Sequence, residues 1–154
     1  MTLDRTDLLI LETLQREGRL SNQDLARRVN LSPSPCLRRV RALEAAGVIR
    51  QYVALVDPRK VGLGLSAYVT VKLEKKGKMP IEQFTRAVLA WPEVVACYSM
   101  TGDMDYLMRV QVTDLEHYSR FVMDKLLKQP GVLDVKSNFV LERVKDTTAV
   151  PLPR

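Results

Sequence analysis

Hydrophobic residues recur at helical spacing near the start of the chain, at Leu8, Leu11 and Leu14. Asp4 precedes this pattern, and Asp7 lies three positions after Asp4. The two residues can therefore form the N-terminal cap of a helix. Gly18 comes shortly after the last of the three leucines and ends the helical pattern. The sequence therefore predicts a first helix between residues 4 and 18.

Two more helices are predicted before residue 48. Ser21 and Asp24 approximate a capping box at the start of the second helix, with Asp in place of the usual Glu or Gln. Ser32 or Ser34 can cap the third helix, and the proline that follows either serine sets the geometry of its first turn. Gly47 ends the third helix.

The third helix has two chemically different faces. At about 100° per residue, its apolar face carries Cys36, Leu37, Val40 and Leu43. The opposite face carries Ser34, Arg38, Arg41 and Ala45, and Arg39 flanks it. We expect the apolar face to dock on the first two helices, with Cys36 as a small buried hydrophobe, and the arginine face to project outward.

After the third helix the pattern changes twice. Residues 48–56 alternate weakly between apolar and polar positions, which predicts a small hairpin or wing. Residues 58–65 contain Pro58, Gly62 and Gly64, which favour a linker or hinge. The sequence therefore divides into residues 1–57, a linker at 58–65, and a second domain at 66–154.

Strict alternation begins at Ala67 and continues through Val69, Val71 and Leu73, which is typical of a half-buried strand. The remaining pattern predicts a helix, two strands, a helix and a last strand, at residues 81–91, 94–101, 105–113, 114–128 and 132–144. This β-α-β-β-α-β order is that of the ferredoxin-like, or split βαβ, arrangement. The predicted fold class is therefore α+β, with a helical N-terminal domain and a ferredoxin-like C-terminal domain.

The last predicted strand is amphipathic. One face carries Leu133, Val135, Phe139 and Leu141, and the other carries Asp134, Lys136, Asn138 and Val140. Such a division fits a sheet whose helices cover one face only. The other face stays open unless a partner covers it.

Composition narrows the possible functions. The 154-residue chain is 46% hydrophobic and carries a formal net charge of +6, with a pI of about 9.5. This basic balance favours anionic partners such as nucleic acid. No apolar run approaches the roughly 20 residues of a membrane span, and no secretory signal opens the chain. Two cysteines are too few for a disulfide framework, so we expect a reduced, cytoplasmic protein.

The sequence gives little support for an enzymatic function. One histidine and two distant cysteines do not predict a metal site. The chain contains no phosphate-binding, dinucleotide-binding, metalloprotease or nucleophile-elbow motif. We therefore expect no catalytic residues, no metal and no cofactor.

The arginine face instead indicates contact with duplex DNA. Two helices, a short turn and a third helix with an outward basic face make a helix-turn-helix, whose last helix fits the major groove. Arginine there can bind guanine or neutralise phosphate. The predicted contacts are Ser34, Arg38, Arg39 and Arg41, with Arg27, Arg28 and Arg50 placed for the DNA backbone. The alternative is a merely solvated basic face.

Three stretches together resemble the leucine-responsive/asparagine operon regulator (Lrp/AsnC) family. They are LDRTDLLILETLQREGRLSNQDLARRVNLSPSPCLRRVRALEAAGVI, YSMTGDMDYLMRV and SNFVLERVKDTTAVPL, at residues 3–49, 98–110 and 137–152. The resemblance spans nearly the whole chain. It implies a winged helix-turn-helix and a C-terminal domain that binds a small molecule, usually an amino acid. It also implies dimers formed by sheet-to-sheet packing, which often join into octamers.

The resemblance also implies an effector pocket between C-terminal domains, around the loop Met100, Thr101, Gly102, Asp103, Met104 and Asp105. Gly102 leaves backbone amides accessible to a carboxylate, and Asp103 or Asp105 can pair with an α-ammonium group. Lys136 and Asn138 can contribute from a neighbouring subunit. Judged without the resemblance, the same loop is a tight hairpin turn.

Three other classes remain as alternatives. The strand and helix order also matches an RNA-recognition motif, and Tyr68 and Tyr98 can share the open face, but the aromatic-rich pattern of that motif is missing. An effector-independent, DNA-organising protein needs only phosphate contacts and oligomerisation. A small-molecule enzyme domain lacks any readable nucleophile and base.

Overall fold

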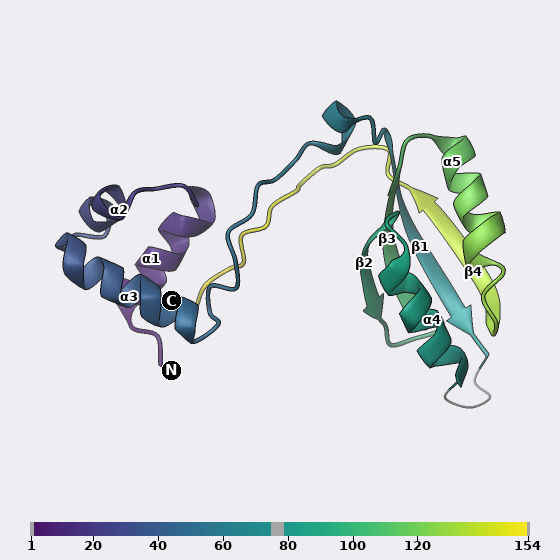
Figure 1. The fold of residues 1–154 in the computed structure, drawn as a ribbon, viewed down its shortest axis with the longest axis horizontal. Coiled ribbons are helices and arrows are strands. Elements are labelled where there is room, and N and C mark those ends of the chain that lie inside the picture. The colour runs from purple at the N-terminus through teal and green to yellow at the C-terminus, as the bar shows by residue number, and fades with distance from the viewer. Residues whose placement is uncertain (1, 75–78, 154) are drawn as a thin grey trace. The chain divides into compact units, whose positions relative to one another are not determined.

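The protein divides into two compact units in a computed structural model, which describes residues 2–74 and 79–153. The helical unit comprises Met1–Leu55 together with Val144–Arg154, and the sheet unit comprises Val56–Arg143 (Figure 1). Residues 144–153 thus belong to the helical unit, whereas the sequence pattern places them with the second domain. Each unit has a hydrophobic core of its own.

The helical unit contains the three predicted helices: α1 at Arg5–Arg16, α2 at Asn22–Arg28 and α3 at Pro33–Ala45. The predicted capping box of α1 is present. The Asp7 N–H donates to Asp4 Oδ1 at 2.8 Å, and the Asp4 N–H donates to Asp7 Oδ2 at 3.1 Å. Ser21 caps α2 by accepting from the Asp24 N–H, and Pro33 occupies the first position of α3 after Ser32.

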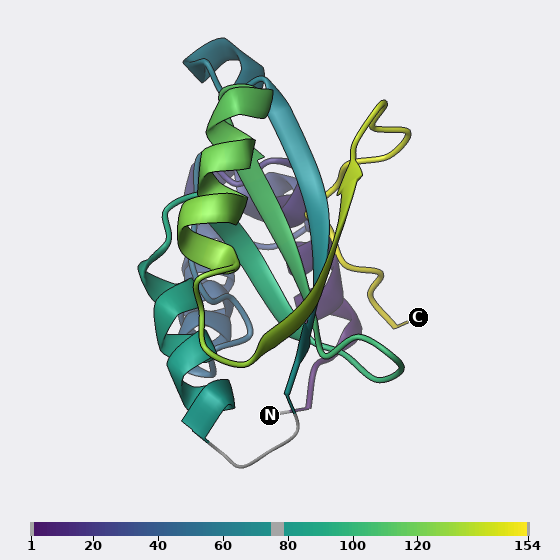
Figure 2. The ribbon, with the colours of Figure 1, turned by 90° about the vertical axis from the view of Figure 1, so that its right-hand side faces the viewer.

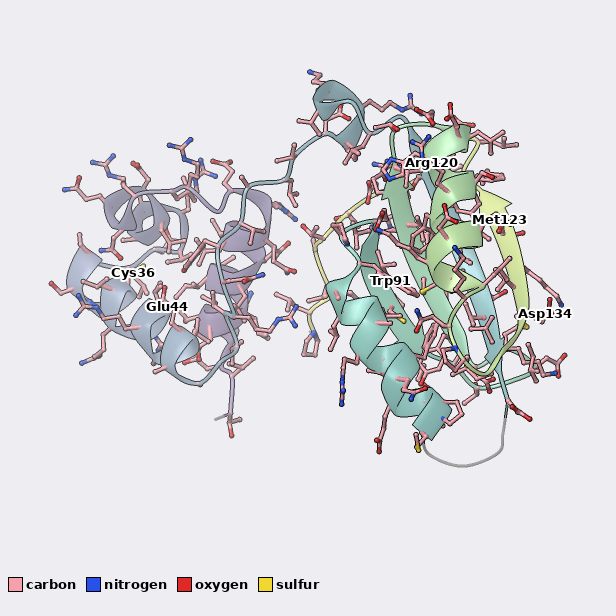
Figure 3. All side chains as sticks on the ribbon, turned by 45° about the vertical axis from the view of Figure 1, so that its right-hand side comes forward. Cys36, Glu44, Trp91, Arg120, Met123 and Asp134 are labelled. Atoms are coloured by element: carbon pink, nitrogen blue, oxygen red, sulfur yellow. The ribbon has the colours of Figure 1, made fainter. Side chains whose placement is uncertain are left out.

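The core of the helical unit is formed where the three helices meet. Its buried members are Ile10, Leu11, Leu25, Ala26, Val29, Cys36 and Leu43. Cys36, labelled on α3 in Figure 3, is fully buried, and burial raises the pKa of its thiol. Leu37 was predicted on the same face but is 37% exposed, so it lies at the margin of the contact. Gly47, with φ of 69°, ends the helical segment.

The sheet unit has the predicted β-α-β-β-α-β order. Its elements are β1 at Leu65–Leu73, α4 at Met79–Ala90, β2 at Val94–Ser99, β3 at Tyr106–Val112, α5 at Leu115–Arg120 with a π-helical continuation at Phe121–Leu126, and β4 at Val132–Phe139. The four strands form one antiparallel sheet in the order β2-β3-β1-β4 (Figures 1 and 2).

Both helices of the sheet unit pack on one face of the sheet. The predicted inward positions of β1 are buried, and Phe84 of α4 and Phe121 after α5 lie fully buried against them. Trp91, labelled at the end of α4 in Figure 3, meets Phe121 edge to face at 5.4 Å between ring centroids. This aromatic contact joins the two helical segments and fixes the covered face. The opposite face carries the exposed positions of the strands.

Two predicted elements are wrong. Residues 48–56, all of which the structure describes, form no strand, and residues 50–57 are exposed. The last strand ends at Phe139 rather than at residue 144, because its register with β1 ends at the pair of Phe139 and Ala67, followed only by a bond from the Val140 N–H to the Ser66 carbonyl. The linker contains a short 3-10 turn at Pro58–Val61.

Candidate functional site

The exposed face of α3 is the first candidate site. Cys36 and Leu43 are fully buried on the opposite side of the helix and fix its orientation against α1 and α2. As a result Ser34, Arg38 and Arg41 face solvent, as predicted. Neither arginine forms an ion pair with any residue that the structure describes. Both guanidinium groups are therefore available to an external anion.

Arg39 is held differently. Its Nη1 donates to Asp4 Oδ2 and to Asp7 Oδ1, at 2.7 Å in both cases. Asp7 is only 4% exposed. Both bonds raise the pKa of the Arg39 guanidinium, and the bond to Asp7 contributes the most. The pKa of the Asp4 carboxyl is lowered, chiefly by the Asp7 N–H and then by Arg39. Arg39 thus joins α3 to the capping box of α1.

Of the other arginines predicted to contact DNA, two are paired with carboxylates of the protein and one is not. Arg28 makes a two-pronged contact with Glu17, at 2.6 and 2.9 Å, which raises the pKa of Arg28. Arg27 lies 3.6 Å from Asp24, and Arg50 is exposed without an ion pair among the described residues. Exposed pairs of this kind contribute little to stability, so phosphate can compete for Arg27 and Arg28.

Sequence reasoning missed the part played by Asp7 beyond the cap. A signal was present, because Asp7 precedes Ile10 and Leu11 by three and four positions and so falls on the buried face of α1. A carboxylate on such a face needs a buried partner. The identity of that partner, 32 residues away, is not visible in the local pattern.

The loop between β2 and β3 is the second candidate site. The Met100 N–H donates to the Asp105 carbonyl at 2.9 Å, which closes the loop as a turn. Gly102, with φ of 109°, adopts a backbone conformation that side-chain-bearing residues rarely take, and Thr101 and Asp103 are exposed beside it. The Asp103 carboxylate is therefore open to a ligand.

Asp105 has a role within the sheet. Its Oδ2 accepts from the Leu73 N–H at 2.7 Å, and its own N–H donates to the Val71 carbonyl at 2.9 Å. These bonds connect the loop to the end of β1. Asp105 therefore shapes the loop, whereas Asp103 presents the accessible charge.

Lys136 and Asn138 lie on the open face of β4, where their partners on β1 are Thr70 and Tyr68. Both side chains are exposed. Among the described residues neither makes a hydrogen bond or an ion pair with the loop, and Lys136 instead lies 4.0 Å from Asp134. Within one chain the structure therefore does not bring these two residues together with Asp103.

Within 2–74 and 79–153, no group of three or more metal-ligating side chains is close enough to hold a metal ion. None of the helices in these ranges has the length and apolar character needed to cross a bilayer.

Two family models match the chain. A model described as winged helix-turn-helix DNA-binding matches residues 3–50, and a model described as Lrp/AsnC ligand binding domain matches residues 66–150. The first match contains α3 and its free arginines. The second contains the loop between β2 and β3.

Known proteins resemble the chain over nearly its whole length. It is 41% identical to the DNA-binding transcriptional activator DecR of Escherichia coli, covering 97% of this chain and 99% of that protein. It is also 41% identical to the leucine-responsive regulatory protein of Escherichia coli, covering 94% and 88%. A transcriptional regulator from Neisseria meningitidis, solved as a complex with L-Met, is 50% identical with a TM-score of 0.95, covering 97% of each chain.

Arg39→Ala is expected to destabilise the helical unit by about 1–3 kcal/mol, because the buried Asp7 carboxylate loses its countercharge. Urea unfolding followed through backbone amide NMR signals of α1 and α3 measures this effect. Arg38→Ala removes the same charge from the same helix and should change stability by no more than about 0.5 kcal/mol. Equal, small effects of the two substitutions would show that the ion pair does not hold α3.

Proposed function

The chain belongs to the Lrp/AsnC family of transcriptional regulators, and from this premise we propose that α3 binds duplex DNA in response to an amino acid held by the sheet unit. One observation carries the DNA part of the proposal. Arg38 and Arg41 are exposed and free on the outward face of α3, while Arg39 beside them is engaged within the protein. The Arg38 and Arg41 side chains are therefore available to bind DNA.

The expected DNA contacts follow from this division. An α-helix fits the major groove, where arginine binds guanine O6 and N7 or neutralises phosphate. We assign Arg38 and Arg41 to such contacts, with Ser34 near the start of α3 and Arg50 on the DNA backbone. Arg27 and Arg28 can exchange their exposed carboxylate partners for phosphate. We assign Arg39 to holding α3 in position.

The proposed effector is an amino acid. Support comes from the match to a ligand-binding domain over residues 66–150 and from the relative that was solved with L-Met. In the loop of Met100, Thr101, Gly102, Asp103 and Asp105, backbone amides near Gly102 can bind a carboxylate and Asp103 can bind an ammonium group. Lys136 and Asn138 would complete the site from a neighbouring subunit.

We propose that the chain forms a homodimer through the open face of the sheet, and that dimers can join into octamers. This face carries Tyr68 and Tyr98, which are 40% and 57% exposed, beside polar positions on β3 and β4. A two-fold dimer presents two copies of α3, so its operator should contain two inverted half-sites.

A ligand at residues 100–105 is far in sequence from α3 and acts through the arrangement of subunits. It can change DNA affinity only by binding one arrangement better than another. A coupling of about 1–3 kcal/mol, or about 5- to 150-fold in affinity, is typical of such systems. The proposal includes no catalytic step and places the protein in the cytoplasm with its DNA.

The double substitution Arg38→Ala and Arg41→Ala is expected to weaken binding to duplex DNA by about 1–3 kcal/mol for each lost contact. Each phosphate contact among them should also reduce the slope of log affinity against log salt by about 0.9. Fluorescence anisotropy at several salt concentrations measures both effects. Arg86→Ala, which removes one exposed arginine on α4, is the charge-matched control for each single substitution, Arg38→Ala and Arg41→Ala. DNA affinity that is unchanged in the folded double variant would contradict the assignment.

The wild-type protein is expected to have a mass of at least twice 17.5 kDa by light scattering at micromolar concentration. Tyr68→Asp places a charge on the open face and should shift the protein towards the monomer. Leu89→Asp makes a similar change on α4, where the side chain is 84% exposed, and should leave the dimer intact. A wild-type monomer that still binds DNA would exclude the proposed dimer.

An amino acid effector should raise the melting temperature of the protein, with L-methionine the first to be tested. A ligand present at 100 times its Kd stabilises the native state by about 2.7 kcal/mol. Asp103→Asn should abolish this shift, and Glu82→Gln, an exposed carboxylate on α4, should not. An undiminished shift in Asp103→Asn would place the ligand elsewhere. If no amino acid changes either melting or DNA affinity, the effector-independent, DNA-organising function becomes the better account.

A further inference from the structure

The C-terminal segment 149–153 lies on the outer side of α1. The Val150 N–H donates to Gln15 Oε1 at 2.6 Å, and Gln15 Nε2 donates to the Val150 carbonyl at 3.2 Å. One glutamine side chain thus satisfies both backbone groups of one residue, as a neighbouring strand would. The two residues are 135 positions apart in the sequence.

Leu152 adds an apolar contact to these hydrogen bonds. It packs against the core of the helical unit and is half-buried, whereas Pro151 and Pro153 on either side are exposed. Proline has a fixed φ and no N–H, so both prolines limit the freedom that the segment loses on docking and leave no unsatisfied donor. The segment forms one wall of an open hollow of about 1140 Å³, whose other wall is α1, including Leu9 and Glu12.

The docked segment is held on α1 by contacts of its own residues. β4 ends at Phe139, and residues 141–148 form no helix or strand and are exposed. The contacts of Gln15 and Leu152 with their partners hold the last residues against α1. The chain leaves the helical unit after Leu55 and returns to it at Val144.

We propose that the outer face of α1 is a docking site for the extended C-terminal segment of the same chain, with Gln15 recognising the Val150 backbone and Leu152 acting as the anchor. Docking gives the helical unit a second connection to the sheet unit, through the non-covalently held tail, in addition to the linker. A second connection restricts independent motion of the DNA-binding unit more than a single linker does. This device goes beyond the function proposed above, and its test requires neither DNA nor effector.

Amide hydrogen exchange in the full-length protein tests the docking. Gln15→Ala should increase exchange at Val150 by about 2- to 13-fold for each hydrogen bond that is lost. Leu152→Ala should also increase it, whereas Gln23→Ala, which shortens an exposed glutamine on α2, should not. Exchange at Val150 that is as fast in the wild type as in Gln15→Ala would overturn the proposal.

Two substitutions at Val150 test whether the docked tail restricts the motion of the helical unit. Val150→Pro removes the N–H that Gln15 accepts, while Val150→Ala keeps it, and the Val150 side chain is already 62% exposed. NMR relaxation should show faster independent tumbling of α1, α2 and α3 in Val150→Pro than in Val150→Ala. Identical tumbling in the two variants would overturn the tethering role.

A mixture of two variants shows whether the tail docks on α1 of its own chain or of a second copy. In a mixture of 15N-labelled Gln15→Ala with unlabelled Val150→Pro, the first chain has an intact tail and the second has an intact Gln15. If each α1 takes its own tail, exchange at Val150 of the labelled chain should stay fast. Recovery of wild-type protection in the mixture would show that the tail docks on a second copy, and would overturn docking within one chain.

Discussion

The buried carboxylate of Asp7 is the constraint on which the helical unit depends. A charge at 4% exposure is unfavourable unless it is paired, and Arg39 supplies the partner at 2.7 Å. Because Arg39 belongs to α3 and Asp7 to α1, the ion pair fixes one helix on the other. The pair therefore supports the orientation that the buried Cys36 and Leu43 give to α3, in which Arg38 and Arg41, the arginines that we assign to DNA, face solvent.

A similar division of roles occurs in the sheet unit. The helices cover one face of the sheet, so the other face stays exposed, and we propose that a second copy of the chain covers it. At the end of β1, Asp105 is bonded to the backbone of Leu73 and shapes the loop, while Asp103 remains exposed. In both units one charged side chain builds the local structure, and its neighbour is free to bind a partner.

Local patterns were sufficient to predict most of the fold. The capping box at Asp4 and the alternation from Ala67 to Leu73 depend on residues close in sequence, and both are present. The order of strands and helices was predicted for the same reason. The contacts of Arg39 with Asp7 and of Gln15 with Val150 join residues 32 and 135 positions apart. Periodicity carries no information about such pairs, so the ion pair of Arg39 and the docked tail were missed.

The central claim is that neighbouring arginines of α3 have separate tasks, with Arg38 and Arg41 binding DNA and Arg39 holding α3 to α1. NMR spectra of the arginine Nε–Hε groups, recorded while duplex DNA is added at low salt, test this claim most directly. The account predicts that the signals of Arg38 and Arg41 shift with DNA concentration and that the signal of Arg39 does not. A shift of Arg39 on DNA binding, with Arg38 and Arg41 unchanged, would contradict it.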